Sequence, residues 1–320
     1  MTKKLVITDY NFPNLTHEKA AAVAEAAEFQ AEKLTTADQV RDILDGADVA
    51  LVQFAPVDKQ AIKVLRPGAT LIRYGVGYDN IDIAAAKEHN VKVAYVPDYC
   101  AAEVADHTTA MLLSAVRKVA ALDTSTRNGQ WNPVVQAAPI LPLDESTIGF
   151  MGFGRIGSLV KTRLEPYGCR FIVADPFVSD EFAETNGFKK VSTMELALLA
   201  DIITLHAPLT SETRHVVDAD FLKAMRPHAI VVNSSRGELI DTQALAASLI
   251  AEQIGGAALD VFEIEPLEMT HPLRTAPNLL ISPHAAWYSA SSIERLQRLA
   301  AEEARRALRD EPLRCLVPGL

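Results

Sequence analysis

The sequence predicts an α/β protein of two domains, each a doubly wound parallel sheet. Two observations lead to this fold class. Short apolar, β-branched runs alternate with amphipathic helical stretches along nearly the whole chain, the pattern of parallel sheets with helices on both faces. The length of 320 residues suits two domains of ordinary size, and 49% hydrophobic with 22% charged residues is a globular composition.

The apolar runs place the expected strands in two groups. In the first hundred residues they predict strands near Leu5, Ala50, Leu71 and Val93. Later runs predict the strands of a second sheet, at residues 147–151, 171–174, 202–205 and 230–233.

Two long helical stretches set the expected domain boundaries. We expect a helix from Ala101 to about Val119 that crosses between the domains. The stretch from Ser289 to about Arg309 has apolar residues at helical spacing and is expected to pack back on the first domain. Residues 1–100 and 285–320 would then form one discontinuous domain, and residues 101–284 the other. Trp131, after an Asn-Gly pair, is predicted to be a buried anchor.

Charge and cysteine content exclude several classes of protein. A net charge of −10 argues against nucleic acid or an anionic membrane as the main partner. The three cysteines, Cys100, Cys169 and Cys315, are far apart and lack metal-type spacing, so we expect a reducing compartment, no disulfides and no metal site. The apolar run at residues 5–8 is too short for a signal peptide or a membrane span. The predicted location is the cytoplasm.

A glycine-rich turn predicts a dinucleotide site. Gly152-Phe153-Gly154-Arg155-Ile156-Gly157 follows an apolar run and opens a helical stretch. In this context the first glycine permits the tight turn, the second lets the backbone approach a pyrophosphate, and the third lets helix and strand pack closely. The helix N-terminus offers free N–H groups and a positive dipole end to the phosphates.

An aspartate at the end of the next run indicates which dinucleotide binds. Asp175 lies at the interval expected for a carboxylate that bonds the adenosine ribose hydroxyls and repels the 2′-phosphate of NADP. The sequence therefore predicts NAD as the cofactor. The alternative is a surface aspartate before Pro176.

Three polar residues follow runs of the same expected sheet. Arg236 can hold a carboxylate through two parallel hydrogen bonds and polarise a neighbouring carbonyl. His284 is a natural proton donor near neutral pH, and Glu265 beside it would favour the imidazolium. Each alone would more often be structural. Together they predict the reduction of a 2-keto acid, which needs hydride at carbon and a proton at oxygen.

Several motifs, taken in order, make the sequence similar to the D-isomer-specific 2-hydroxyacid dehydrogenase family. The resemblance covers most of the chain and is carried by Gly75-Val76-Gly77-Tyr78-Asp79-Asn80-Ile81-Asp82, the glycine turn, His206-Ala207-Pro208-Leu209-Thr210, Ser234-Ser235-Arg236-Gly237, Ala258-Leu259-Asp260-Val261-Phe262, Glu265-Pro266 and Pro283-His284.

The resemblance implies a fold and further site residues. It implies Rossmann-like and flavodoxin-like domains, with the NAD-binding domain inserted in a discontinuous substrate (catalytic) domain, and a homodimer. Arg236, Glu265 and His284 match the family's catalytic residues. Val76 and Gly77 match a loop whose N–H groups meet the substrate carboxylate. The cofactor-binding residues implied by the match, beyond the glycine turn and Asp175, are Thr108, His206, Ala207, Pro208, Thr213, Ser234, Ser235 and Asp260.

One branch of the family is more similar than the rest. Arg73 and the residues after His284 resemble the C-terminal binding protein branch and its bacterial relatives, which implies that Arg73 and Trp287 reach the substrate pocket. For Trp287 the alternative is a core or interface aromatic, and for Arg73 a surface ion pair. Formate dehydrogenase is disfavoured, because that relative usually has glutamine where this chain has Glu265.

The predicted function is an NAD-dependent D-2-hydroxyacid dehydrogenase that reduces a small 2-keto acid such as glyoxylate or hydroxypyruvate. One alternative is an NAD(H)-sensing interaction or corepressor protein of the C-terminal binding protein type. Another is phosphoglycerate dehydrogenase, against which stands the lack of a basic cluster beyond Arg73 in the early loops. Pocket volume, and so the particular acid, is not predicted.

Overall fold

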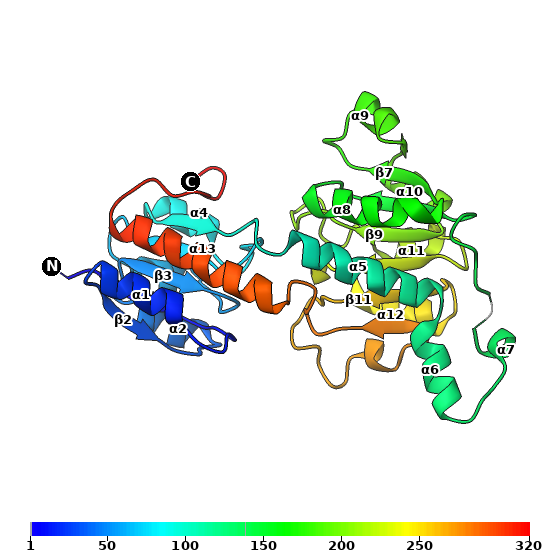
Figure 1. Cartoon of the computed structure of the whole chain (residues 1–320), viewed down its shortest axis with the longest axis horizontal. Coiled ribbons are helices and arrows are strands. Elements are labelled where there is room, and N and C mark those ends of the chain that lie inside the picture. Colours follow the sequence, from blue (N-terminus) through cyan, green and yellow to red (C-terminus); the bar gives the residue numbers. More distant parts are fainter. Residues whose placement is uncertain (1, 138) are drawn as a thin grey trace. The chain divides into compact units, whose positions relative to one another are not determined.

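The computed structural model describes residues 2–137 and 139–320. The chain divides into two compact units, Met1–Cys100 with Ser289–Leu320 and Ala101–Tyr288. Each unit contains one sheet whose neighbouring strands are all parallel, with helices packed on it (Figure 1). The predicted fold class is confirmed. Within the described residues no helix is long and apolar enough to span a membrane.

The first unit has a five-stranded sheet in the order β2-β1-β3-β4-β5, which is the flavodoxin-like order. All four predicted strands are present. The fifth, β2, is an edge strand with half of its residues exposed, so it carries no apolar run that would reveal it. The strands are β1 (Lys4–Ile7), β2 (Glu28–Ala31), β3 (Val49–Val52), β4 (Thr70–Arg73) and β5 (Lys92–Tyr95).

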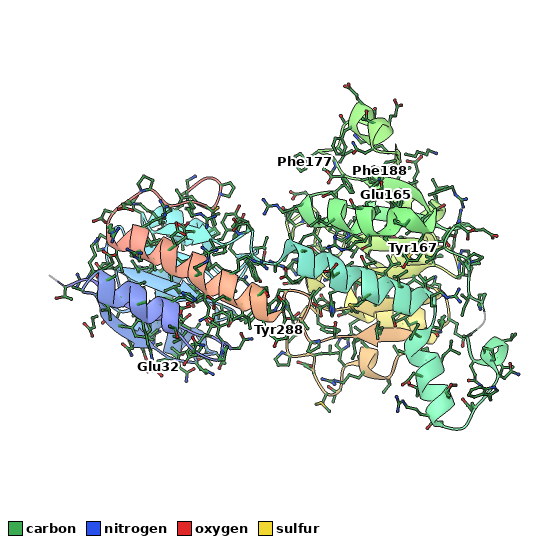
Figure 2. The ribbon with its side chains drawn as sticks, in the orientation of Figure 1. Glu32, Glu165, Tyr167, Phe177, Phe188 and Tyr288 are labelled. Atoms are coloured by element: carbon green, nitrogen blue, oxygen red, sulfur yellow. The ribbon has the colours of Figure 1, made fainter. Side chains whose placement is uncertain are left out.

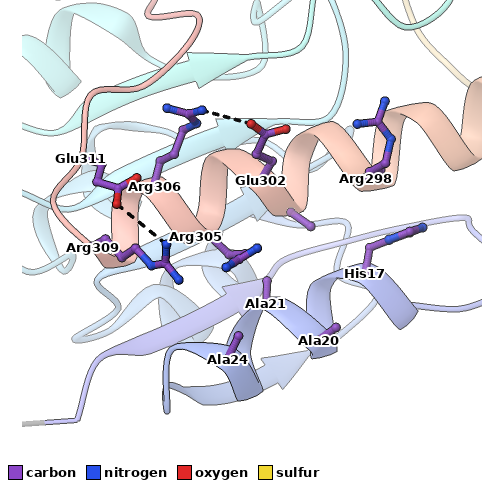
Figure 3. Close-up of a pocket in the computed structure, with 11 residues that line it drawn as sticks. His17, Ala20, Ala21, Ala24, Arg298, Glu302, Arg305, Arg306, Arg309 and Glu311 are labelled. Atoms are coloured by element: carbon purple, nitrogen blue, oxygen red, sulfur yellow. Dashed lines mark hydrogen bonds and ion pairs between the residues drawn. The ribbon is translucent and has the colours of Figure 1, made fainter.

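The helices of this unit are α1 (Thr16–Ala24), α2 (Ala37–Leu44), α3 (Lys59–Lys63), α4 (Ile83–Glu88) and α13 (Ala290–Leu308). The predicted C-terminal helix is α13, and it packs on α1, β3 and β4 as expected. Small residues of α1, Ala20, Ala21 and Ala24, face α13 across a groove rimmed by arginines (Figure 3). Glu25, just after α1, pairs with Arg305 and with Arg309 of the α13 end, which ties the two helices together.

The second unit has a seven-stranded sheet in the order β12-β11-β10-β9-β6-β7-β8. The chain starts at β6, runs outward through β7 and β8, then returns to the other side of β6 through β9. This is the strand order of the dinucleotide-binding Rossmann fold, whose ligands bind where the order reverses. The strands are β6 (Thr147–Met151), β7 (Arg170–Ala174), β8 (Phe188–Lys190), β9 (Ile202–Leu205), β10 (Ile230–Asn233), β11 (Gly256–Leu259) and β12 (Leu279–Ile281).

Two apolar layers hold this sheet. One, on the side of α10 to α12, includes Leu205 and Val231, and the other, on the side of α5 and α8, includes Phe150 and Val232. The buried Phe188 of β8 belongs to the second layer, whereas Phe177 is almost fully exposed (Figure 2). The helices are α5 (Ala101–Val116), α6 (Val119–Arg127), α7 (Pro133–Ala137), α8 (Arg155–Leu164), α9 (Asp180–Thr185), α10 (Thr193–Leu199), α11 (Ala219–Ala224) and α12 (Thr242–Ile250).

The prediction for Trp131 is wrong. Its side chain is 87% exposed, on the segment that joins α6 and α7. Val134 and Val135 of the short helix α7 are also largely exposed. This segment therefore has an apolar surface that the unit's own core does not cover.

Candidate active site

The glycine turn lies at the carboxyl end of β6 and leads into α8. Gly152 has a φ of +82°, and a Cβ there would lie 2.6 Å from the backbone nitrogen of Ala207, so only glycine fits. Gly154 is exposed, and a Cβ there would meet nothing within 4 Å. The backbone before α8 is thus open on the side where a pyrophosphate needs to approach.

The third glycine has a different role from the one predicted. A Cβ on Gly157 would meet its nearest atom at 3.4 Å, an ordinary contact, so close packing does not require glycine there. Close helix–strand packing instead depends on Gly149 of β6, where a Cβ would lie 2.8 Å from the Leu196 side chain of α10. No motif in the sequence indicates this need for glycine, because Gly149 lies inside an apolar run.

Asp175 directly follows β7 and reaches back to the glycine turn. One carboxylate oxygen accepts a hydrogen bond from the N–H of Phe153 at 2.7 Å, and the other accepts from the N–H of Phe177 at 2.7 Å. The carboxylate is half-buried beside the open glycine turn. These features fit NAD: an open N-terminus for the phosphates and a carboxylate at the position that bonds the ribose.

The loop after β9 lies against the glycine turn. His206 stacks on Phe150 at 5.8 Å between ring centroids, and its Nε2 lies 3.0 Å from Thr204 Oγ1. Burial lowers the pKa of His206 to about 4, so the ring is neutral at pH 7. The Oγ1 of Thr213 donates to the carbonyl of Pro208 at 2.7 Å, which closes this loop.

The loop after β10 is fixed by its own side chains. Ser235 donates from Oγ to the carbonyl of Ala207 at 2.9 Å, which joins it to the loop after β9. Thr108 is fully buried, and its Oγ1 lies 2.5 Å from Ser234 Oγ. Because Thr108 Oγ1 already donates to the carbonyl of Val104, Ser234 supplies the proton between the two hydroxyls.

Arg236 lies at the end of the same loop. Its Nη1 donates to the carbonyl of Ser235 at 2.7 Å. The next residue, Gly237, passes so close to the chain after β11 that a Cβ would lie 1.9 Å from the carbonyl carbon of Phe262. Phe262 in turn donates its N–H to Glu265 Oε1 at 2.9 Å. The loops of Arg236 and Glu265 therefore pack directly on each other.

Glu265 and His284 form the pair predicted from the sequence. Glu265 Oε2 lies 2.6 Å from His284 Nδ1, with about 30% of each side chain exposed. A carboxylate accepts, so Nδ1 carries the proton of this hydrogen bond and Nε2 faces away from Glu265. His284 has a φ of +51°, a left-handed conformation that a non-glycine residue adopts only when its surroundings hold it.

Asp260, at the end of β11, holds the backbone around His284. Its backbone carbonyl accepts the N–H of His284 at 2.7 Å, and its carboxylate accepts the N–H groups of Ala285 and Ala286 at 2.8 Å each. Ser282 Oγ also donates to the carboxylate. Burial raises the pKa of Asp260, but hydrogen bonds from His107, Ser282 and the two backbone N–H groups outweigh burial and lower it to about 2.

The residues that the resemblance assigns to the substrate lie in both units. In the first unit, Arg73 ends β4, and its guanidinium lies 5.7 Å from the centre of the Phe54 ring. Gly75 has a φ of +140°, and a Cβ there would lie 1.7 Å from Arg73 Nη1, so the guanidinium lies directly on the loop of Val76 and Gly77. Val76 and Gly77 give no N–H to another group in the part of the chain that the structure describes.

Trp287 belongs to the second unit, three residues after His284. Its ring is half-buried and meets the Tyr288 ring edge to face, with 6.0 Å between the ring centroids and 87° between the ring planes. Tyr288 itself is exposed (Figure 2). The aromatic pair thus follows directly on the loop that Asp260 fixes.

Sequence reasoning missed the residues that support this loop. Ser282 bonds Asp260, and His107 of α5 lies 3.1 Å from Ser282. Neither carries a motif of its own. The nearest signal was position: Ser282 directly follows an apolar run, two residues before His284.

Comparisons with known proteins give the chain's relatives. Residues 109–286 match the family model "D-isomer specific 2-hydroxyacid dehydrogenase, NAD binding domain". A D-3-phosphoglycerate dehydrogenase of Methanocaldococcus jannaschii is 34% identical over 96% of this chain, which spans only 58% of the length of that relative. A glyoxylate reductase of Korarchaeum cryptofilum is 34% identical, covering 77% of this chain and 75% of that one.

A solved structure extends the likeness to the whole chain. The NAD-dependent formate dehydrogenase of Staphylococcus aureus, in complex with NAD, is 29% identical, with a TM-score of 0.88 and coverage of 98% of both chains.

Proposed function

Because the chain belongs to the D-isomer-specific 2-hydroxyacid dehydrogenase family of NAD-dependent oxidoreductases, which act on CH–OH groups, we propose that it reduces a small 2-keto acid with NADH. Glyoxylate and hydroxypyruvate are the candidate substrates. The observation that carries the proposal is the 2.6 Å hydrogen bond between Glu265 and His284. His284 lies on a strained loop at the carboxyl ends of the strands, where the glycine turn also lies. The family's cofactor is NAD. In this proposal residues 152–157 and Asp175 hold it.

Each of the three polar residues has one task in this proposal. Arg236 pairs with the substrate carboxylate and polarises the keto group. His284 gives the proton on Nε2 to the keto oxygen, because Nδ1 is engaged by Glu265. Glu265 orients the imidazole ring and stabilises its charged form. When bound, NADH supplies the hydride.

The first unit is proposed as the substrate domain. Its Val76 and Gly77 N–H groups are candidate donors to the substrate carboxylate, next to the guanidinium of Arg73. Trp287, three residues after His284, is proposed as a further substrate contact. We propose the domain limits as residues 1–100 with 285–320, and residues 101–284.

Two other activities are weighed against this one. Formate dehydrogenase is the activity of one structural relative. It is disfavoured by Glu265, because hydride transfer from formate to NAD involves no proton transfer to a substrate oxygen and so needs no carboxylate–histidine proton donor. A purely NAD(H)-sensing interaction protein is disfavoured by the same pair, since a sensor has no chemical need of a proton donor.

We propose a homodimer, in which a second copy covers the segment from α6 to α7. The exposed side chains of Trp131, Val134 and Val135 support this, because an apolar surface of this kind marks an interface. A monomer in analytical ultracentrifugation at micromolar concentration would refute it.

The proposed reaction is tested by NADH oxidation, followed by absorbance, with a panel of 2-keto acids. The panel runs from glyoxylate and hydroxypyruvate to phenylpyruvate and a phosphorylated acid, with NADPH and formate plus NAD in parallel. We expect turnover of a small unphosphorylated acid with NADH and much less with NADPH, since Asp175 repels a 2′-phosphate. Tight NADH binding without turnover of any acid would favour the sensor, and formate oxidation would favour a formate dehydrogenase.

A further inference from the structure

Helix α5 carries a histidine that the proposed reaction does not use. His107 Nε2 lies 3.1 Å from Ser282 Oγ and 3.5 Å from Asp260 Oδ1. Ser282 follows β12 and Asp260 follows β11, so the histidine meets the carboxyl ends of two neighbouring strands. Helix α5 packs on β10, β11 and α8, which makes it a rigid support for such a contact.

The hydrogen-bond directions in this cluster follow from the donors available. Asp260 is ionised and only accepts, so the single hydroxyl proton of Ser282 goes to its Oδ1, 2.5 Å away. The serine oxygen must then accept from the ring, which means that His107 Nε2 carries a proton. The result is a directed chain from His107 through Ser282 to Asp260.

The far end of this chain is the loop of His284. The Asp260 carboxylate accepts the N–H groups of Ala285 and Ala286, and its carbonyl accepts that of His284. These three hydrogen bonds are donated by His284, whose backbone is left-handed, and by the two residues after it. They fix the direction in which the His284 ring leaves the loop.

We propose that His107 is a positioning residue, which acts through Ser282 and Asp260 to hold the His284 loop in the orientation needed for proton transfer. Without its N–H, Ser282 Oγ loses the donor that orients it, so the Ser282 hydroxyl and the Asp260 carboxylate that it bonds can rotate, the carboxylate away from the Ala285 and Ala286 N–H groups. A proton donor displaced by a fraction of an ångström transfers its proton more slowly, while the cofactor turn at residues 152–157 is untouched. This inference rests on the proposed function.

The test compares two substitutions at position 107. His107→Leu fills the space without a donor, whereas His107→Gln places an amide N–H₂ close to the position of Nε2 and restores the bond to Ser282. We expect the leucine variant to lose about 10- to 100-fold in kcat and the glutamine variant to recover most of it.

A histidine at the amino ends of the strands of the same sheet provides a matched control. His228 Nε2 lies 2.7 Å from Oδ1 of the buried Asp201, before β9. His228→Leu removes a similar contact far from the His284 loop, so we expect it to lower Tm without lowering kcat. Equal kcat losses in the leucine and glutamine variants at position 107, or wild-type kcat in both, would overturn the proposal.

A second measurement works even if no substrate is found. Hydrogen exchange of a peptide covering residues 282–288 reports directly on the N–H groups that Asp260 holds. We expect faster exchange there in His107→Leu and wild-type exchange in His107→Gln. Unchanged exchange in the leucine variant would refute the role of His107, whereas a wild type that reduces no 2-keto acid would refute only the proposed function.

Discussion

The strands of the seven-stranded sheet begin along one side, the amino edge, and end along the opposite side, the carboxyl edge. A buried aspartate contacts a histidine at each of these edges, but the two aspartates bind different backbone segments. At the amino edge, Asp201 accepts from His228, from Arg226 Nη1 and from the N–H of Thr147, all at 2.7 to 2.8 Å. At the carboxyl edge, Asp260 accepts from Ser282 and from two N–H groups of the loop after His284.

The difference lies in what the carboxylate fixes. Asp201 joins the start of β6 to the turn that carries His228, where none of residues 226–229 has a positive φ. Asp260 fixes a loop that contains a residue with a φ of +51°. Burial raises the pKa of both carboxyls, and hydrogen bonds lower both below their usual value. A buried aspartate–histidine contact therefore does not mark a functional site by itself, whereas its connection to strained backbone does.

The largest expected effect is at the carboxyl edge itself. His284→Asn removes the proton donor, and asparagine tolerates the left-handed backbone, so the loop keeps its shape. We expect kcat to fall about 1,000-fold, within the range for loss of a general acid, with NADH binding nearly unchanged. The measurement is steady-state kinetics with a fluorescence titration of NADH. His228→Asn is the control, and near-wild-type turnover of the His284 variant would contradict the assignment.

An arginine at each edge extends the comparison. Arg236→Lys keeps the charge but removes the two parallel hydrogen bonds of a guanidinium, so we expect KM to rise and kcat to fall together, about 100-fold in kcat/KM. Arg226→Lys, at the amino edge, should leave both constants unchanged. Equal kinetic losses in the two variants would show that the loss at Arg236 reflects general destabilisation, and not substrate binding.

The aspartates are compared directly by Asp260→Asn and Asp201→Asn. The N–H₂ group of each new asparagine faces donors that the carboxylate of the aspartate had accepted from. We therefore expect each variant to lose about 2 kcal/mol of unfolding free energy. Only Asp260→Asn should also lose kcat, by about 10- to 100-fold, because only it releases the His284 loop. Calorimetry and kinetics on both variants test this. A matching loss of kcat in Asp201→Asn would remove the distinction between the edges.

Acid stability sharpens the same comparison. Since the pKa of Asp260 is lowered to about 2, its stabilising effect is present above its ordinary pKa and is lost only as the pH falls through about 2. The Tm difference between Asp260→Asn and the wild type should therefore stay constant between about pH 5 and pH 8.

A buried carboxyl in the first unit behaves in the opposite way. Glu18 is fully buried and bonded by the Tyr74 hydroxyl and the Gln297 amide, and burial raises its pKa despite these bonds. A raised pKa contributes stability below the ordinary value of 4.5, which is lost as the pH rises through the folded-state pKa.

Glu18→Gln is the test with the smallest expected effect. We expect the Tm of the variant to rise relative to that of the wild type as the pH rises from 4.5 toward neutral. Glu32→Gln, at an exposed glutamate, is the control and should show no such trend (Figure 2). A Tm difference for Glu18→Gln that does not change with pH would mean that the carboxyl has its ordinary pKa.

Much of the fold was predictable because the buried strands are continuous apolar runs. The edge strands β2 and β8 were missed, because exposed edge positions carry polar residues, and β11 was not placed from its short Gly-Ala-Ala-Leu run. The prediction that Trp131 is buried rested on its hydrophobicity alone. A single sequence does not distinguish an apolar side chain at an interface from one in the core.

The site was predictable to the extent that it lies at strand ends. Glu265 and His284 meet as expected, because the chains after β11 and β12 leave neighbouring strands at the same edge. The support of His107 was not predictable, since a contact across 175 residues depends on how α5 packs on the sheet. The same holds for Gly149, whose need for glycine comes from Leu196 on another element.

We propose that the protein delivers hydride to one face of the keto carbon and a proton to the keto oxygen, so that a 2-keto acid becomes the D-2-hydroxy acid. The most direct test is to let the wild-type protein oxidise NADH with hydroxypyruvate or pyruvate and to resolve the product by chiral chromatography. We predict one equivalent of the D enantiomer for each NADH consumed. The L enantiomer, a racemate, or NADH loss without a hydroxy acid would contradict the account.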